Sequence, residues 1–310
     1  MKSGQSGDCR VRINVDGVLR TVVYGYPCSI HIDPIEKKPF FHFLPGTTAL
    51  SLATVGCNLH CLNCQNWEIS QTNPEQSEVV FCPPEKLVSL AKENNCDSIA
   101  YTYTDPIVYY EYTYDTSKLA RKAGLRNVLV TAGYANPQPW KDLLKVVDAA
   151  TIDLKGITEE FYRNICSATL KPIQDNLVAT KASGVELEVS NLIISTLNDK
   201  PEEIRELVRW IKANLGGDTP LHFLGFFPRY KMRHLPPTSA ETLETAHEIA
   251  VAEGMQCVYI GNIMSRQGQN TYCPGCKNLL IERSGYIVLQ CRVKNGCCPD
   301  CGKAIYGVWK

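Results

Sequence analysis

The sequence lacks the features that direct a protein to a membrane or to nucleic acid. No uninterrupted apolar run approaches the ~20 residues of a membrane-spanning helix, and the first residues, MKSGQSGDCRVRINVDG, lack the apolar core of a signal peptide. Net charge is also absent, because 32 Lys and Arg balance 32 Asp and Glu. The overall charge therefore gives no reason to expect binding to nucleic acid or to an anionic membrane. We expect a cytoplasmic protein.

Repeats and low-complexity segments are absent too, which excludes solenoid and disordered architectures. The 310 residues are 44% hydrophobic and 21% charged, a globular composition. This length suits one large domain with an appendage, or two ordinary domains.

Cysteine, by contrast, is abundant. Fifteen cysteines are many for a reducing compartment, and several are clustered at C-x2-C and C-x3-C spacings. Such clusters indicate metal ligation better than a disulfide framework.

Between residues 49 and 268, apolar β-branched runs alternate with amphipathic segments, which predicts a parallel sheet with helical crossovers. The pattern is shorter than a closed eightfold barrel, so we expect an α/β fold with a partial, open (β/α)6-type barrel. We assign 1–48 to an N-terminal extension with strands near 9–15 and 19–26, and 269–310 to a C-terminal metal-binding region. The expected barrel strands are 49–56, 98–104, 126–133, 149–156, 185–194, 221–227 and 255–261. The expected helices are 83–94, 107–124, about 140–147, one opened by Thr158, 172–184, 199–215 and 239–254.

The segment GCNLHCLNCQNW (56–67) directly follows the first barrel strand and carries Cys57, Cys61 and Cys64. A tetrahedral zinc site needs a fourth ligand, and the C-x3-C offset is unusual for a zinc knuckle. Alternatively, three thiolates can bind three irons of a [4Fe–4S] cluster and leave the fourth iron open to a chelating molecule. Ligands bind at the carboxyl ends of strands in such sheets, where this loop lies.

This C-x3-C-x2-C loop, together with DPIEKKPFFHFLPGT (33–47), YTYTDP (101–106), IDLKG (152–156) and HFLGFFP (222–228), resembles radical S-adenosylmethionine (SAM) proteins of the AmmeMemoRadiSam group, which are similar to pyruvate formate-lyase activating enzymes. The resemblance implies a [4Fe–4S] cluster on Cys57, Cys61 and Cys64, with SAM as cosubstrate. It also implies an external one-electron donor of flavodoxin or ferredoxin type. The expected reaction yields methionine and a 5′-deoxyadenosyl radical, which abstracts hydrogen from a substrate.

Five further residues are candidates for cofactor binding. Asp105 stands where related enzymes have Asn-Glu-Pro and this chain has Thr-Asp-Pro; it either contacts the methionine ammonium or caps the next helix. Asp153 and Lys155 face the same way at a strand end, as SAM ligands or as a rim salt bridge. Ser190 is a candidate for the SAM ribose, and His222 for the cavity. Both also suit structural hydrogen bonding.

The tail holds a second cysteine pattern, Cys273-Pro-Gly-Cys276 and Cys298-Pro-Asp-Cys301. Two C-x2-C pairs at this separation predict a zinc-ribbon or rubredoxin-like site with zinc, or iron, as the ion. Nearby cysteines leave a second cluster open as an alternative. Cys9 and Cys28 have no obvious partners, and we assign no metal to them.

Three functions remain open. The first is a radical SAM enzyme with an unidentified substrate. The second is an activase that installs a glycyl radical on a partner protein, which would make the substrate a protein. The third is a non-catalytic metal-binding protein whose tail recognises a partner.

Overall fold

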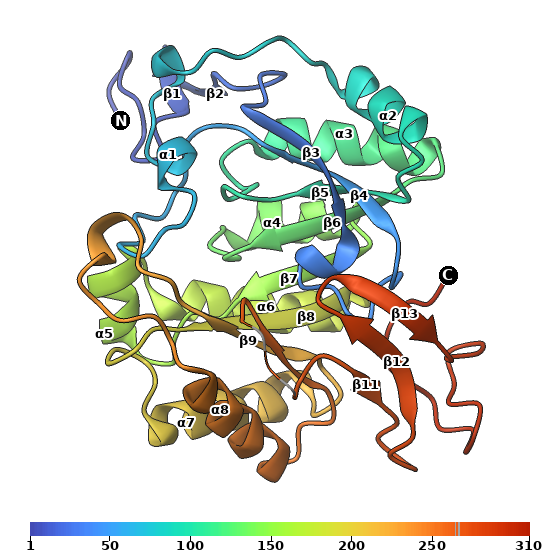
Figure 1. Ribbon diagram of the computed structural model, residues 1–310. Coiled ribbons are helices and arrows are strands. Elements are labelled where there is room, and N and C mark those ends of the chain that lie inside the picture. The colour runs from blue at the N-terminus through green and yellow to red at the C-terminus, as the bar shows by residue number, and fades with distance from the viewer. Residues whose placement is uncertain (264, 266) are drawn as a thin grey trace.

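The computed structural model describes residues 1–263, 265 and 267–310. An eight-stranded sheet forms the centre of the molecule (Figure 1). Its strands lie side by side in sequence order, from β3 at one edge to β10 at the other. Strands β4 to β10 are all parallel to one another, whereas β3 (Ser29–Pro34) pairs antiparallel with β4. The parallel strands are β4 Thr48–Ala53, β5 Ser98–Tyr101, β6 Arg126–Thr131, β7 Ala149–Asp153, β8 Glu186–Ile193, β9 Leu221–Gly225 and β10 Val258–Gly261.

Six helical crossovers connect these seven strands, which confirms the predicted α/β fold of six βα units. Crossovers of this kind place the helices against the sheet and bury the strands on both faces. The crossover helices are α2 Pro84–Glu93, α3 Tyr110–Lys122, α4 Pro137–Leu144, α6 Leu170–Ser183 with the single turn α5 Glu159–Phe161 before it, α7 Pro201–Leu215 and α8 Ala240–Ala252.

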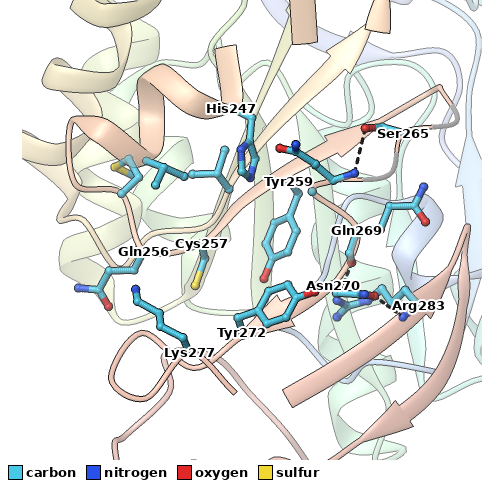
Figure 2. A pocket seen from close by; sticks show the side chains of 15 residues that line it. His247, Gln256, Cys257, Tyr259, Ser265, Gln269, Asn270, Tyr272, Lys277 and Arg283 are labelled. Carbon is cyan, nitrogen blue, oxygen red and sulfur yellow. Dashed lines mark hydrogen bonds between the residues drawn. The ribbon is translucent and has the colours of Figure 1, made fainter. Parts of the chain in front are cut away.

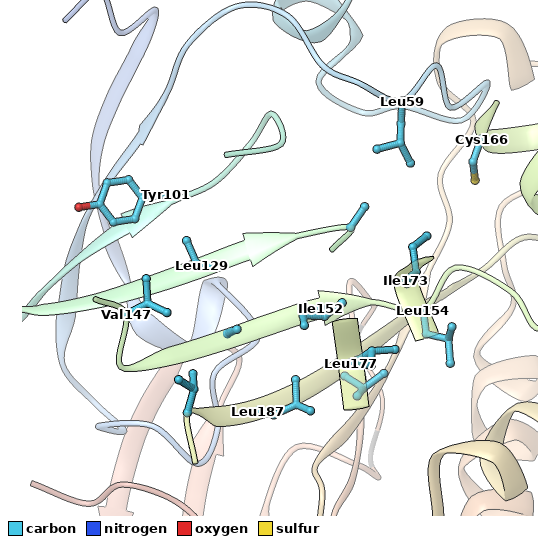
Figure 3. Packing of buried hydrophobic residues seen from close by; sticks show 14 of the residues in the cluster. Leu59, Tyr101, Leu129, Val147, Ile152, Leu154, Cys166, Ile173, Leu177 and Leu187 are labelled. Atoms are coloured by element: carbon cyan, nitrogen blue, oxygen red, sulfur yellow. The ribbon is translucent and has the colours of Figure 1, made fainter. Parts of the chain in front are cut away.

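The core lies between the strands and these helices. Leu129, Ile152 and Leu187 occupy neighbouring strands, and Leu177 reaches them from α6; all four are fully buried (Figure 3). Helix α7 buries Ile204, Leu207, Val208 and Ile211, spaced to form one face of a helix. This packing fixes the strand ends, and therefore the loops that follow them.

The N-terminal segment takes part in the main sheet, which the sequence did not lead us to expect. Predicted strands near 9–15 and 19–26 appear as the hairpin of β1 (Arg12–Val15) and β2 (Val18–Thr21). No strand was predicted at β3, which pairs with β4 along its whole length, from Ser29 opposite Ala53 to Pro34 opposite Thr48. Its central residues are exposed, as at an edge, so it lacks the continuous apolar run that marks the inner strands.

The C-terminal segment forms a small three-stranded antiparallel sheet of β11 (Thr271–Tyr272), β12 (Leu279–Ser284) and β13 (Ile287–Cys291). The C-terminal segment also contacts the N-terminal extension, since Val308 forms an isolated parallel β-bridge with Phe43. Arg283 of β12 is buried over the Phe41 ring, 4.2 Å from its centroid, and donates to the Phe41 carbonyl. Among the described residues, no helix is both long and apolar enough to span a bilayer.

Candidate active site

The cysteine loop leaves the carboxyl end of β4 through Gly56, a position that no other residue suits. Gly56 has φ +86°, in the left-handed region, and its amide donates to the Ile69 carbonyl at 2.9 Å. A Cβ atom there would lie 2.5 Å from the Cys9 carbonyl oxygen and 2.6 Å from Val11 Cγ1. The N-terminal extension therefore packs directly against the start of the loop.

A second segment holds the middle of the loop. The amides of His60 and Leu62 donate to the carbonyls of Cys166 and Ile165, at 3.1 and 2.9 Å. Cys64 Sγ lies 3.3 Å from Ser70 Oγ in the short helix α1 (Trp67–Ser70). Hydrogen bonds to the segment around Ile69 and to Ile165 and Cys166 therefore hold the loop that carries the three thiols.

All three predicted thiols line one cavity of about 260 Å³ at the carboxyl ends of the strands. Asp105, which follows β5, and Asp153 and Lys155, at the end of β7, line the same cavity. The structure thus brings together six of the predicted residues from three separate strand ends.

Asp105 is buried, and protein donors surround its carboxylate. Thr131 Oγ1 donates to both oxygens, at 3.0 and 3.1 Å, and the amides of Ala132 and Ile107 donate at 2.9 and 3.1 Å. Burial raises the pKa of Asp105, and these hydrogen bonds act against that rise. The bond to Ile107 lies within the turn before α3 and is not a helix cap, because α3 begins at Tyr110 with Tyr109 as its N-cap. The bonds to Thr131 and Ala132 join the rims of β5 and β6.

Asp153 and Lys155 form a salt bridge of 2.6 Å, and Ser190 of β8 donates to the other oxygen of Asp153. Burial alone would lower the pKa of Lys155, but Asp153 and the nearby sulfurs of Cys61 and Cys166 raise it well above its ordinary value. Lys155 therefore carries a fixed positive charge beside the cysteines.

The comparisons with known proteins point in the same direction as this geometry. The family model described as "Radical SAM superfamily" matches residues 51–211, just over half of the chain. The chain belongs to the radical SAM superfamily.

Of the two similar proteins that follow, one is named for an activity and the other is not. An uncharacterized protein of Methanocaldococcus jannaschii is 46% identical over 309 residues, which cover 98% of this chain and 91% of that protein. The pyruvate formate-lyase-activating enzyme of Clostridium pasteurianum is 25% identical over 162 residues, covering 51% of this chain and 66% of the enzyme.

Among solved structures, Streptococcus suis SuiB aligns with a TM-score of 0.55 and 12% identity, over 74% of this chain and 52% of SuiB. At this identity the likeness concerns the fold alone.

Membership of the radical SAM superfamily implies a [4Fe–4S] cluster and SAM, and the donor set fits a cluster better than a single ion. Among the described residues, the groups whose ligand atoms all lie within 4.8 Å of one another include the four tail cysteines but not Cys57, Cys61 and Cys64. Thiols that bind different irons must stand farther apart than ligands of one ion. Burial raises the pKa of Cys57 and of Cys64, so bound metal must displace the thiol protons.

His222 lies elsewhere in this radical SAM fold. It is the second residue of β9, and its Nε2 lies 2.6 Å from Glu188 Oε2 in a fully buried cluster. Its ring packs on Tyr259, which lines a second cavity of about 440 Å³ between β10, α8 and the C-terminal sheet (Figure 2). The structure therefore does not bring His222 to the cavity of the cysteines.

Sequence reasoning missed several residues of the cysteine cavity. Lys37, Lys38 and Tyr103 line it. Asp33 accepts hydrogen bonds from Lys37 and Tyr103 and forms a salt bridge with Lys38. The signal in the sequence is the pair of lysines between two prolines in DPIEKKP, polar residues within a buried stretch. Cys166, outside the lining of the cavity, was also missed: its interaction with Cys61, together with burial, raises the pKa of Cys61.

The four tail cysteines converge as the sequence predicted for a site able to hold a metal. Cys273 Sγ lies 3.5 Å from Cys301 Sγ, and Cys276 Sγ lies 3.7 Å from Cys298 Sγ. A tetrahedral Zn–S site with bonds of about 2.3 Å requires sulfur–sulfur distances of about 3.8 Å. The four-cysteine group thus has the spacing of a single-ion site.

Proposed function

We propose that this protein is an enzyme that cleaves SAM reductively at a [4Fe–4S] cluster bound by Cys57, Cys61 and Cys64, and abstracts hydrogen from a further substrate. The main support is that three spaced thiols line one cavity together with Asp105 and the Asp153–Lys155 pair. When bound, the reduced cluster would supply one electron, which converts SAM into methionine and a 5′-deoxyadenosyl radical.

The surrounding residues would bind and orient the cosubstrate. Lys155, held by Asp153, offers a fixed cation to the methionine carboxylate, and Ser190 keeps Asp153 in place. The four donor contacts of Asp105 fix its carboxyl group and the rim of β5 and β6 beside the cavity. We therefore assign Asp105 an electrostatic and positioning role toward the methionine ammonium, and Ser190 a role through Asp153.

An anaerobic turnover assay tests this proposal. The wild-type protein, reconstituted with iron and sulfide and reduced with dithionite, should form 5′-deoxyadenosine from SAM. Cys61→Ala should form none, whereas Cys96→Ala, which removes a buried cysteine outside the cavity, should retain turnover. Equal turnover by the Cys61 variant would refute the assignment.

A second candidate function lies within the same chemistry: an activase that generates a glycyl radical on a partner protein. Two curated relatives support it, the pyruvate formate-lyase-activating enzyme above and the 4-hydroxyphenylacetate decarboxylase activating enzyme of Clostridium scatologenes, 25% identical over 168 residues. An activase would produce a glycyl signal in the electron paramagnetic resonance (EPR) spectrum of its partner. The absence of that signal with active enzyme and each candidate partner would favour another substrate.

We further propose that the chain belongs to the AmmeMemoRadiSam group, on the motifs given above, and that a flavodoxin- or ferredoxin-like protein supplies the electron. Zinc is the proposed ion of the tail, because four thiolates at tetrahedral spacing are a typical structural zinc site.

A further inference from the structure

The cysteine cavity contains a buried lysine for which SAM chemistry gives no role. Lys38 follows the short turn Ile35–Lys37 after β3, and only 3% of its side chain is exposed. Its Nζ lies 2.7 Å from Asp33 Oδ2 and 4.1 Å from the centre of the Tyr103 ring. Lys38 lines the same cavity as the three cysteines.

The lysines of this cavity differ in their electrostatic surroundings. Lys155 is held in its charged form by Asp153 and the neighbouring sulfurs. Burial, by contrast, lowers the pKa of Lys38 to about 8 against the opposing effect of Asp33, and the charge of Lys37 adds to the lowering. A desolvated lysine beside another cation is the usual environment of an amine nucleophile.

Asp33 has hydrogen-bond partners in addition to Lys38. Its Oδ1 accepts from Lys37 Nζ at 2.7 Å, and its Oδ2 accepts from the Tyr103 hydroxyl at 2.5 Å. Lys38 can therefore lose a proton or form a covalent bond without leaving a buried carboxylate unpaired, which would be costly.

The charges of the group indicate which carbonyl compounds it would accept. Asp33, Lys37 and Lys38 together carry one net positive charge, and Lys37 is about half exposed. An anionic substrate would neutralise that charge, so a carbonyl compound with a carboxylate is favoured over a neutral one.

We propose that Lys38 forms a Schiff base with the carbonyl group of a 2-oxo acid and so anchors the substrate of the radical reaction. Nζ adds to the carbonyl carbon, the C–O bond then breaks, and the oxygen leaves as water. The ammonium and the carbonyl give one iminium ion and one water, so charge is conserved and no electrons are transferred. The proposal rests on the proposed function, because it places this anchor in the cavity of the radical chemistry.

Borohydride trapping tests the Schiff base without any turnover of SAM. The full-length protein, loaded with iron, sulfide and zinc, is incubated with pyruvate and sodium cyanoborohydride, digested and mapped by mass spectrometry. The expected product is an N-(1-carboxyethyl) group on Lys38, well in excess of that on Lys171, whose side chain is 79% exposed. Lactate, which lacks the carbonyl, should give no adduct.

Variants separate anchoring from nonspecific reaction. Lys38→Met and Lys38→Arg should lose the specific adduct, and Lys37→Ala should keep it while requiring more pyruvate. Wild-type protein with no adduct on Lys38, or with labelling of exposed lysines to the same extent, would overturn the proposal, whether or not the variants fold. Because trapping needs no SAM, 5′-deoxyadenosine formation without an adduct would refute the Schiff base alone, and an adduct without 5′-deoxyadenosine would refute the radical function alone.

Discussion

The substitution Gly56→Ala tests whether the N-terminal extension positions the cysteine loop. The new methyl group would lie 2.5 Å from the Cys9 carbonyl oxygen and 2.6 Å from Val11 Cγ1, while φ is +86°. The left-handed conformation costs an alanine ~1–2 kcal/mol, and the steric overlap adds ~1–3 kcal/mol. We therefore expect the free energy of unfolding to fall by roughly 2–5 kcal/mol, the sum of these two contributions.

Gly124→Ala is the matched control. Gly124 has a similar φ of +82°, but a Cβ atom there would meet nothing within 4 Å. It should lose only the conformational part, ~1–2 kcal/mol. Urea denaturation of both variants measures the difference, and iron analysis after reconstitution shows whether the loop still binds its cluster.

The expected pattern is a larger loss of stability for Gly56→Ala, together with lower iron content than Gly124→Ala. Equal losses for the two variants, with full iron in both, would refute the reasoning. The extension would then have no steric role at the loop.

Three other predictions concern the rim, the tail and the interior. Asp105→Asn places an amide NH₂ among donors from Thr131, Ala132 and Ile107, so the free energy of unfolding should drop by ~1–3 kcal/mol in denaturant titrations; an unchanged midpoint would contradict the contacts. Cys298→Ser should lose the tail metal measured by mass spectrometry of the native protein, whereas Cys291→Ser, outside the four-cysteine group, should keep it; metal retained by the first variant would show other ligands. Burial lowers the pKa of His42 to about 4, so between about pH 6.5 and pH 4 the unfolded chain binds a proton that the folded chain does not. Stability should therefore fall by roughly 3 kcal/mol as the pH decreases through that window, and His42→Gln should flatten this dependence while the exposed His234→Gln does not; identical pH profiles for all three proteins would contradict the assignment.

The barrel could be predicted from the sequence because its strands are buried on both faces. Short runs rich in apolar residues, such as ALSLATVG at 49–56, alternate with helical segments, and all seven predicted parallel strands are present. The edge strand β3 was missed, because its exposed central residues break the apolar pattern.

The cavity was predictable only where a motif marks the end of a strand. Cys57, Asp105 and Asp153 all follow or end strands, so topology alone brings them together. His222 stands at the start of β9, and its position in the strand could have been weighed against the family pattern. Lys38 comes from outside the βα repeat, and only the tertiary packing of the N-terminal extension places it beside the cysteines.

The central claim is that three cysteines bind a cluster whose fourth iron takes SAM. The most direct test is the EPR spectrum of the reduced, reconstituted protein with and without SAM. The account predicts a reduced [4Fe–4S] signal that changes on addition of SAM in the wild type and in Cys96→Ala, and no such cluster in Cys57→Ala. A signal unaffected by SAM, or a cluster that survives the loss of Cys57 unchanged, would contradict it.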